Sequence, residues 1–140
     1  MKFKVILDNE NIRMPEKAHD ADAGFDIFAP KDFVVRCGSS AIVDTGVHIE
    51  IPKGYVGFLK SKSGLNVNFG ITGGEGVIDS GYTGSIVAKL YSHQKTVHFK
   101  KGQKIVQIVF LPIPDVELEL TDVFEETERG NGGFGSTGDF

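Results

Sequence analysis

The chain has 140 residues, 40% of them hydrophobic and 24% charged, and a formal net charge of −4. This length suffices for one domain with a hydrophobic core. The acidic balance argues against direct binding of nucleic acid or of a membrane surface, because both need clustered lysine and arginine. Any anionic ligand must therefore be bound by a local group of residues.

The N-terminus and the single cysteine indicate the compartment. The apolar run within Met1–Asp8 is too short for a signal peptide or a membrane span. Cys37 has no partner for an internal disulfide, which suits a reducing compartment. The four histidines show no metal-ligand spacing, so we expect them to be strand or surface residues. We predict a cytoplasmic protein, in the host cytoplasm if a phage encodes it.

Short stretches rich in alternating or β-branched residues predict an all-β domain. In chain order, strands are expected at residues 47–51, 55–59, 86–91, 97–99 and 105–111. Turn-forming clusters rich in glycine, proline, serine and lysine lie at residues 38–40, 52–54, 73–76, 100–102 and 112–114. Short strands separated by turns at short intervals are typical of a sandwich, jelly roll or barrel. One short helical turn is expected after Ser63.

Two segments in the first half of the chain carry groups suited to anions or metals. Asp26 follows Gly24, which permits a tight bend, but the spacing and closing glutamate of a calcium loop are missing. Residues 60–64, Lys-Ser-Lys-Ser-Gly, follow the strand at 55–59. A cation, a hydroxyl and a glycine in succession can form an anion nest, although a basic hairpin loop has the same composition.

Asp79 is the strongest candidate for chemistry. It follows an apolar strand within a glycine-rich stretch and precedes Tyr82. A carboxylate fixed in this way can orient a water and accept its proton, although the same residues also suit a plain turn between strands. Gln107 lies within the apolar strand at 105–111. A buried amide needs hydrogen-bond partners, which either the protein or a ligand can supply.

The β pattern ends near Glu125, so we predict a β domain over residues 1–124 and a flexible arm over residues 125–140. Five glycines between positions 130 and 138 let backbone N–H groups approach an anion, and Arg129 adds a planar fork for phosphate. Phe134 has no core to enter, so its ring is free to stack on a nucleobase. A disordered glycine-rich terminus is the alternative interpretation.

Together, these five segments resemble, in order, the five sequence motifs of the trimeric dUTP diphosphatases, the dUTPases. The matching stretches run from about Ala23 to Gly138 and read AGFDIF, SKSGLN, GVIDSGYTGSI, KGQKIVQIVF and RGNGGFGSTG. The resemblance implies a distorted jelly-roll domain of the β-clip type that forms a homotrimer with shared active sites. It also implies hydrolysis of dUTP to dUMP and pyrophosphate, which keeps uracil out of DNA and supplies dUMP for dTMP synthesis.

The resemblance further implies roles for individual residues. Asp79 would orient the water that attacks the α-phosphorus, and Tyr82 would pack under the deoxyribose. Mg²⁺ would neutralise the triphosphate, and Asp26 would reach the metal through water. Backbone groups before and after the third motif would read uracil, while the second and fourth motifs and the arm would hold the phosphates and cover the base. The other expected substrate-binding residues are Lys62, Ser63, Gly64, Gly73, Gly76, Val77, Ile78, Val87, Gln107, Arg129, Phe134, Gly135, Ser136 and Thr137.

Three departures from the family pattern concern the expected phosphate site and its surroundings. Lys62 stands where arginine is usual, which exchanges a planar fork for a point charge. Gly81 stands where a second acid is frequent, and we assign it no catalytic role. Gln103 and Lys104 replace a frequent pair of an acid and an arginine, which we expect to weaken a contact with the arm or between subunits.

Two alternative functions stay open on the sequence alone. The related dCTP deaminases share the fold and bind deoxynucleoside triphosphates, but they need a catalytic glutamate in the third motif, where this chain has Asp79. A nucleotide-sensing or protein-binding module could instead use the closing arm as a switch, and Lys62 is the departure that favours it. Such a sensor would bind dUTP without turnover.

Overall fold

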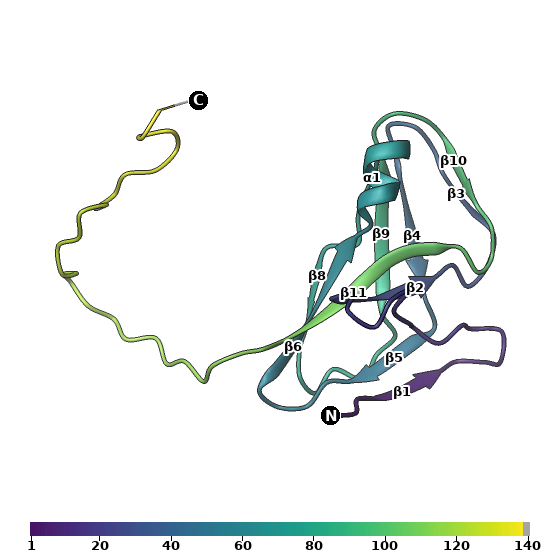
Figure 1. Ribbon diagram of the computed structural model, residues 1–140, viewed down its shortest axis with the longest axis horizontal. Coiled ribbons are helices and arrows are strands. Elements are labelled where there is room, and N and C mark those ends of the chain that lie inside the picture. Colours follow the sequence, from purple (N-terminus) through teal and green to yellow (C-terminus); the bar gives the residue numbers. More distant parts are fainter. Residues whose placement is uncertain (139–140) are drawn as a thin grey trace.

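The computed structural model describes residues 1–138 and is built almost entirely from short strands (Figure 1). The prediction of an all-β domain with one short helix is confirmed. The elements are β1 (Lys4–Leu7), β2 (Gly24–Phe28), β3 (Phe33–Val35), β4 (Ser40–Asp44), β5 (Val47–Glu50), β6 (Tyr55–Ser61), α1 (Ser63–Phe69), β7 (Ile71–Gly73), β8 (Gly76–Ile78), β9 (Val87–Ser92), β10 (Val97–Phe99) and β11 (Lys104–Pro112).

All strand pairings in the described chain are antiparallel. The largest sheet has the order β2-β11-β6-β8, and a second sheet has the order β4-β9-β7. Two further pairs, β1 with β5 and β3 with β10, complete the body. Because consecutive strands rarely pair, the segments that the sequence singled out are brought together by long-range contacts rather than by local hairpins.

The core is formed by aliphatic residues on the inward side of these strands. In β9, for example, Ala88 and Leu90 are buried while Lys89 and Tyr91 are exposed, as the alternation predicts. The two sheets and the smaller pairs share one cluster, which contains Ile27, Val35, Val43, Val47, Ile49, Ile51, Leu59, Ile71, Ile86, Leu90, Phe99, Ile105 and Ile108. This single core gives the site residues on β2, β6 and β11 a rigid base.

Helix α1 follows β6 directly and matches the helical turn expected after Ser63. Lys62 occupies its N-cap position with an extended backbone and makes no side-chain capping hydrogen bond. Gly70 ends the helix in the left-handed conformation with φ 69°, and its N–H donates to the carbonyl oxygen of Asn66. Lys62 therefore lies at a defined junction between the end of β6 and the start of α1.

The chain after β11 leaves the body and does not fold back onto it (Figure 1). Residues 113–138 contain no helix or strand and are largely exposed. Val116, Leu118 and Leu120 alternate with acidic residues and are 67%, 93% and 98% exposed. The division at residues 124 and 125 stays a prediction, and residues 139 and 140 of the predicted arm lie outside the described part of the chain.

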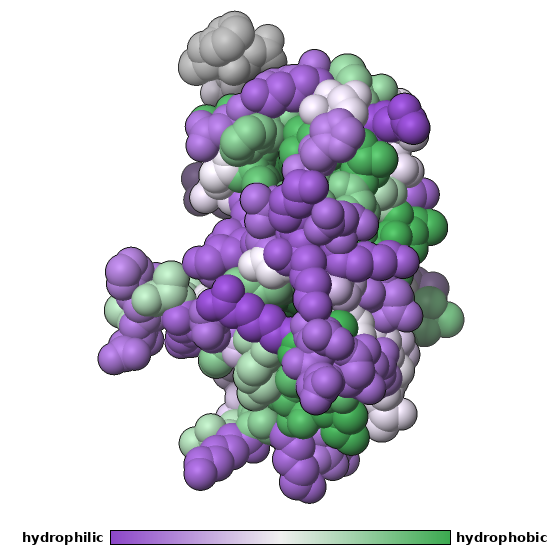
Figure 2. Space-filling model, turned by 90° about the vertical axis from the view of Figure 1, so that its right-hand side faces the viewer, coloured by the Kyte–Doolittle hydropathy of each residue, from purple (hydrophilic) through white to green (hydrophobic). Residues whose placement is uncertain are grey.

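One face of the molecule, drawn in Figure 2, carries hydrophobic side chains in separate patches among hydrophilic ones. Such a mixture is ordinary for protein surfaces, which expose many apolar atoms. Within residues 1–138, no helix has the length and apolar character needed to span a membrane.

Candidate active site

Three of the five segments meet on the largest sheet. Gln107 on β11 is paired with Asp26 on one side and with Lys60 on the other. The half-buried Gln107 amide donates from Nε2 to the carbonyl oxygen of Ser61 at 3.1 Å. Lys62 follows the end of β6 and forms an ion pair with Asp26. The sheet thus brings the first, second and fourth segments to one place.

The Asp26 carboxylate is held by two lysines although it is only 3% exposed. Its Oδ1 accepts from Lys62, and its Oδ2 lies 2.6 Å from Nζ of Lys104. Burial alone would raise the pKa of Asp26, but hydrogen bonds from Lys104 and Lys62 outweigh that effect and hold this pKa below its ordinary value. Two ammonium groups around one carboxylate leave a local excess of positive charge, which suits an anionic ligand.

A bulge in β11 explains why Lys104 reaches this acid. The pairing of β11 with β2 shifts between Lys104 and Val106, and such shifts redirect side chains. Gln103, its neighbour, instead accepts the N–H of Lys100 through Oε1 at 2.9 Å within a turn. Both departures from the family pattern therefore make contacts inside this chain.

Gly24 leaves the space that the Gln107 amide occupies. A Cβ at position 24 would lie 2.3 Å from Oε1 of Gln107, so a larger residue must displace that side chain. We expect Gly24→Ala to fold, because the end of Gln107 is flexible. If dUTP is the substrate, as the motif resemblance implies, its KM should rise about fivefold, which is about 1 kcal/mol, typical of one hydrogen bond. Steady-state kinetics would measure the change. In a Gln107→Ala background the same substitution should cost nothing further, and an added cost there would contradict this explanation.

The turn between β7 and β8 links the two sheets. The Gly73 backbone has φ 106°, and a Cβ there would lie 2.1 Å from the carbonyl oxygen of Lys89, so only glycine allows this approach. Gly74 donates its N–H to the same oxygen at 2.9 Å. β8 pairs with β6 and forms the edge of its sheet within the described chain. The outer backbone groups of Gly76–Ile78 therefore have no strand partner in this chain.

Asp79 lies directly after β8 in a tight turn. Tyr82 donates its N–H to the carbonyl oxygen of Asp79 at 3.2 Å, and Gly81 takes φ 85°. The Tyr82 hydroxyl donates to the carbonyl oxygen of Ser85 at 2.9 Å, and a Cβ at Gly84 would meet that hydroxyl at 2.3 Å. Asp79 is thus a turn residue whose backbone is held by this hydrogen bond and whose carboxylate is exposed.

A single chain does not bring Asp79 to the lysines. Ile78, the residue before Asp79, pairs with Gly57 of β6, whereas Gln107 pairs with Lys60. The three-residue offset along β6 corresponds to about 10 Å, and β8 and β2 form opposite edges of the sheet. The acid and the anion-binding lysines therefore belong to separate partial sites.

The arm gathers its own predicted residues away from the body. Arg129, Phe134, Gly135, Ser136 and Thr137 all line one open hollow of about 780 Å³. Nε of Arg129 donates to the carbonyl oxygen of Gly132 at 3.2 Å. Phe134 is fully exposed and has φ 51°, which is unfavourable for an aromatic residue. The described part of the arm is a third partial site, which lies away from the body of strands (Figure 1).

The single carboxylate of Asp26 fits an Mg²⁺ ion that is coordinated mainly by a bound triphosphate and by water. Residues 1–138 contain no group of three or more acidic, histidine or cysteine side chains arranged to hold a metal ion. Mg²⁺ bound to a triphosphate keeps several waters and needs only one or two carboxylates. Each Asp26 oxygen keeps a free lone pair beyond its lysine, and can accept a hydrogen bond from a metal-bound water.

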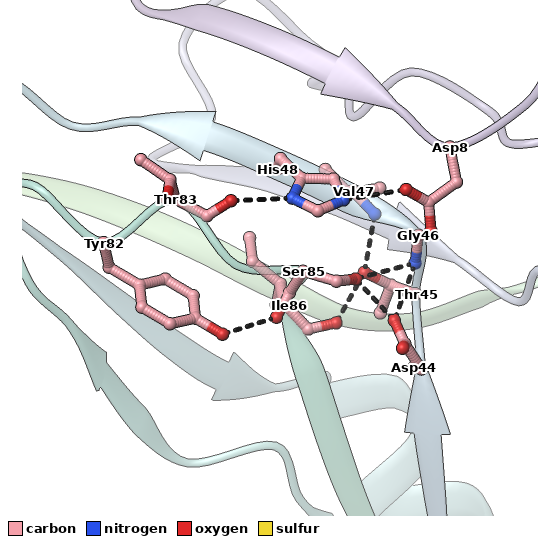
Figure 3. Close-up of polar contacts among 10 residues, drawn as sticks. All are labelled: Asp8, Asp44, Thr45, Gly46, Val47, His48, Tyr82, Thr83, Ser85 and Ile86. Atoms are coloured by element: carbon pink, nitrogen blue, oxygen red, sulfur yellow. Dashed lines mark hydrogen bonds and ion pairs between the residues drawn. The ribbon is translucent and has the colours of Figure 1, made fainter.

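A network around His48 was missed by the sequence reasoning. His48 bridges Asp8 and Thr83, and neighbouring residues hold Ser85 and Ile86 (Figure 3). The partners of His48 lie 40 and 35 residues away in sequence. No local pattern could have indicated this contact.

The fold and these partial sites define an all-β protein with a lysine-rich group suited to an anionic ligand. The model of the dUTPase family matches residues 10–138, and the chain belongs to this family. The deoxyuridine 5'-triphosphate nucleotidohydrolase of Clostridium tetani is 40% identical over 139 residues, which cover 97% of this chain and 96% of that protein. The protein of the same name from Saccharomyces cerevisiae is 36% identical over 138 residues, covering 97% and 94%.

Solved structures agree with this assignment. A mutant dUTPase of Staphylococcus bacteriophage 80alpha with dUpNHpp superposes with a TM-score of 0.89 at 32% identity, covering 98% of both chains. A mutant dUTPase from phage phi11 of S. aureus, described with a structural Mg(II) ion, gives 0.83 at 30% identity, covering 90% of this chain and 100% of that one. The predicted family and jelly-roll fold class are thereby confirmed.

Proposed function

We propose that this chain hydrolyses dUTP to dUMP and pyrophosphate. The observation that carries the proposal is the exposed Asp79 carboxylate, which stands on a hydrogen-bonded turn at the end of an unpaired strand edge and is followed by Tyr82. The backbone groups of the β8 edge can pair with a base, and the Tyr82 ring can pack against a sugar. The Asp79 carboxylate lies between the two in sequence, where it can act on the adjoining phosphate. Family membership and the nucleotidohydrolase names of the relatives support the same reaction.

Asp79 is proposed to act as general base. It would orient a water in line with the α-phosphorus and accept its proton as the new P–O bond forms. The bond from the α-phosphorus to the bridging oxygen then breaks, and pyrophosphate leaves. Preorganisation favours this step, because the turn closed by Tyr82 fixes the backbone that carries the carboxylate before substrate arrives.

Base and sugar selection are assigned to the strand edge and Tyr82. The unpaired backbone of Gly76, Val77 and Ile78, with Gly73 before it and Val87 after it, would pair with uracil. Cytosine presents the reversed donor pattern and would leave buried groups unpaired. The Tyr82 ring, held through its hydroxyl, would pack under the deoxyribose and collide with a ribose 2′-hydroxyl.

The phosphates are assigned to the lysine-rich group and the arm. Lys62, Ser63, Gly64 and Gln107 would hold the α- and β-phosphates, because Lys62 and Gln107 are the neighbours of Asp26 and Ser63 and Gly64 directly follow Lys62 at the start of α1. Mg²⁺, when bound, would neutralise the triphosphate charge, with Asp26 as its outer partner through water. The arm would hold the γ-phosphate and cover the base with Arg129, Phe134, Gly135, Ser136 and Thr137.

A homotrimer is proposed as the active form. One chain keeps Asp79, the lysines and the arm apart, so a complete site needs several copies. The exposed alternating segment with Val116, Leu118 and Leu120 has the pattern of a strand with one buried face, which another copy could cover. The cytoplasm stays our prediction for the location.

The test is pyrophosphate release from dUTP, measured beside dCTP, dTTP and UTP with and without Mg²⁺. We expect release from dUTP only, because base and sugar are both selected. Chelation of Mg²⁺ by EDTA should lower the rate by about 10²-fold or more, since the metal offsets several kcal/mol of charge. Excess Mg²⁺ should restore it.

Other outcomes would identify the alternatives. Release of ammonia from dCTP would indicate a deaminase. Tight binding of dUTP without pyrophosphate would contradict the proposal and favour the sensor. Light scattering in parallel would show the oligomeric state, and an active monomer would contradict the shared site.

A further inference from the structure

His48 on β5 joins two segments that are distant in sequence. Its Nδ1 lies 2.8 Å from the carbonyl oxygen of Thr83, and its Nε2 lies 2.8 Å from Oδ1 of Asp8 (Figure 3). Thr83 directly follows Tyr82 in the loop 79–86, which also carries Asp79. Asp8 directly follows β1, the strand paired with β5. The ring therefore connects the loop of the proposed catalytic acid to the β1–β5 pair.

Among the described residues, the other hydrogen bonds that tie this loop to the rest of the fold lie at its end. Ile86 donates to the Val47 carbonyl oxygen at 2.8 Å and accepts from the Thr45 hydroxyl at 2.7 Å. Ser85 bonds through its hydroxyl to Asp44, and the Gly46 N–H donates to it at 3.1 Å. These anchors hold residues 85 and 86 only. His48 is the anchor that reaches Thr83, beside Tyr82.

Only the protonated ring can make both contacts as a donor. The Thr83 carbonyl and the ionised Asp8 carboxylate are acceptors, and a neutral imidazole has a single N–H. Loss of the proton leaves a ring lone pair facing one of the two oxygens. One contact is then lost, whichever tautomer forms.

The surroundings of His48 favour the protonated form. The hydrogen bond to the Thr83 carbonyl raises the pKa of His48 most, and the hydrogen bond to Asp8 raises it further. Asp44, at the end of β4, adds a second carboxylate nearby. The bridge is therefore complete at low pH and is lost as pH rises through the raised pKa of the folded protein.

We propose that His48, in its protonated form, is a positioning residue that fixes the loop 79–86 for catalysis. The proposal rests on the proposed hydrolysis of dUTP, because its effect passes through Asp79 and Tyr82. His48 itself touches neither substrate nor reacting atoms. It makes the geometry of the loop depend on pH through a group outside the site.

The first test compares the pH dependence of kcat in wild type and His48→Gln. Glutamine is neutral and can donate to Thr83 but cannot bridge two acceptors with donors on opposite sides. We expect the wild-type kcat to fall about tenfold as pH rises through the His48 pKa, and the variant to stay low and flat, with KM within threefold. His98→Gln, an exposed histidine on β10, is the matched control and should keep the wild-type profile.

A second variant shifts the pKa of His48 and keeps the histidine. Asp8→Asn keeps an acceptor for Nε2 but removes its charge, so the pKa of His48 should fall. The loss of kcat should then occur at lower pH than in wild type. A profile of Asp8→Asn identical to that of wild type would overturn the proposal, as would a His48→Gln profile that keeps the same alkaline fall.

Amide hydrogen exchange separates this proposal from the proposed function. Exchange is compared with the intrinsic rate at each pH, because all amides exchange faster as pH rises. Residues 82–84 should lose protection at high pH in wild type and at all pH values in His48→Gln, while residues 86–90 stay protected. Unchanged exchange of residues 82–84 overturns the anchor, even if the enzyme is active. An absence of pyrophosphate release from wild type with the expected exchange refutes the proposed hydrolysis and the catalytic role of the loop, but not the pH-dependent contact.

Discussion

Replacement of Asp79 by asparagine should lower the rate of pyrophosphate release from dUTP by about 10³-fold, the middle of the range for a general base. Asparagine keeps the size and a hydrogen-bond acceptor but does not take up the proton of the attacking water. The side chain is exposed in a turn whose hydrogen bond joins backbone groups, so the fold should not change. Binding of a non-hydrolysable dUTP analogue should therefore remain within a few-fold of wild type.

A control substitution at another exposed aspartate separates the loss of the catalytic group from the change in net charge. Asp20 is exposed in a turn outside the partial sites, and Asp20→Asn changes the net charge of the chain by the same amount. It should keep the wild-type rate. A rate of Asp79→Asn within tenfold of wild type would show that another group activates the water.

Deletion of residues 125–140 should lower kcat/KM for dUTP by about 10²- to 10³-fold and leave the melting temperature almost unchanged. The described part of this segment carries the Arg129 fork and the Phe134 ring but makes no strand contact with the body. The loss should arise from missing phosphate contacts and from water that is no longer excluded. Stopped-flow pyrophosphate release and calorimetry on the same samples would measure both quantities.

The control keeps the length of the arm. Replacement of Glu125 and Glu126 by glutamine alters the charge of the segment but none of its proposed ligand-binding residues. This variant should behave as wild type. A large drop in melting temperature on deletion would instead indicate that the arm mainly stabilises the assembly.

Local sequence patterns predicted β5, β6, β9, β10, β11 and the apolar strand before Asp79, but not β1, β2, β3, β4 or β7, and not how the strands assemble. The alternation in β9 and the Asp79 turn depend on neighbouring residues, so the strand and the turn could both be read directly. The motif resemblance indicated that Asp26, Lys62 and Gln107 act together, and the register of β2, β11 and β6 places them together. Their roles toward substrate stay predictions.

The contacts that escaped prediction all depend on tertiary register. The Lys104 side chain reaches Asp26 because β11 bulges, and no residue type in that stretch indicates a bulge. His48 resembles any polar strand residue until β1 and the loop 79–86 are placed on either side of it. Sequence spacing reveals periodicity, whereas these contacts are set by how separate strands align.

The three-residue offset between the pairings of Ile78 and Gln107 has a consequence for the cell. On the proposed arrangement, a newly synthesised copy is inert until it has met others. Total activity then grows more steeply than the concentration of the chain, and a low concentration of the chain gives almost no activity. Expression level would act as a threshold, so the timing of the activity could be set by synthesis alone, without a dedicated inhibitor.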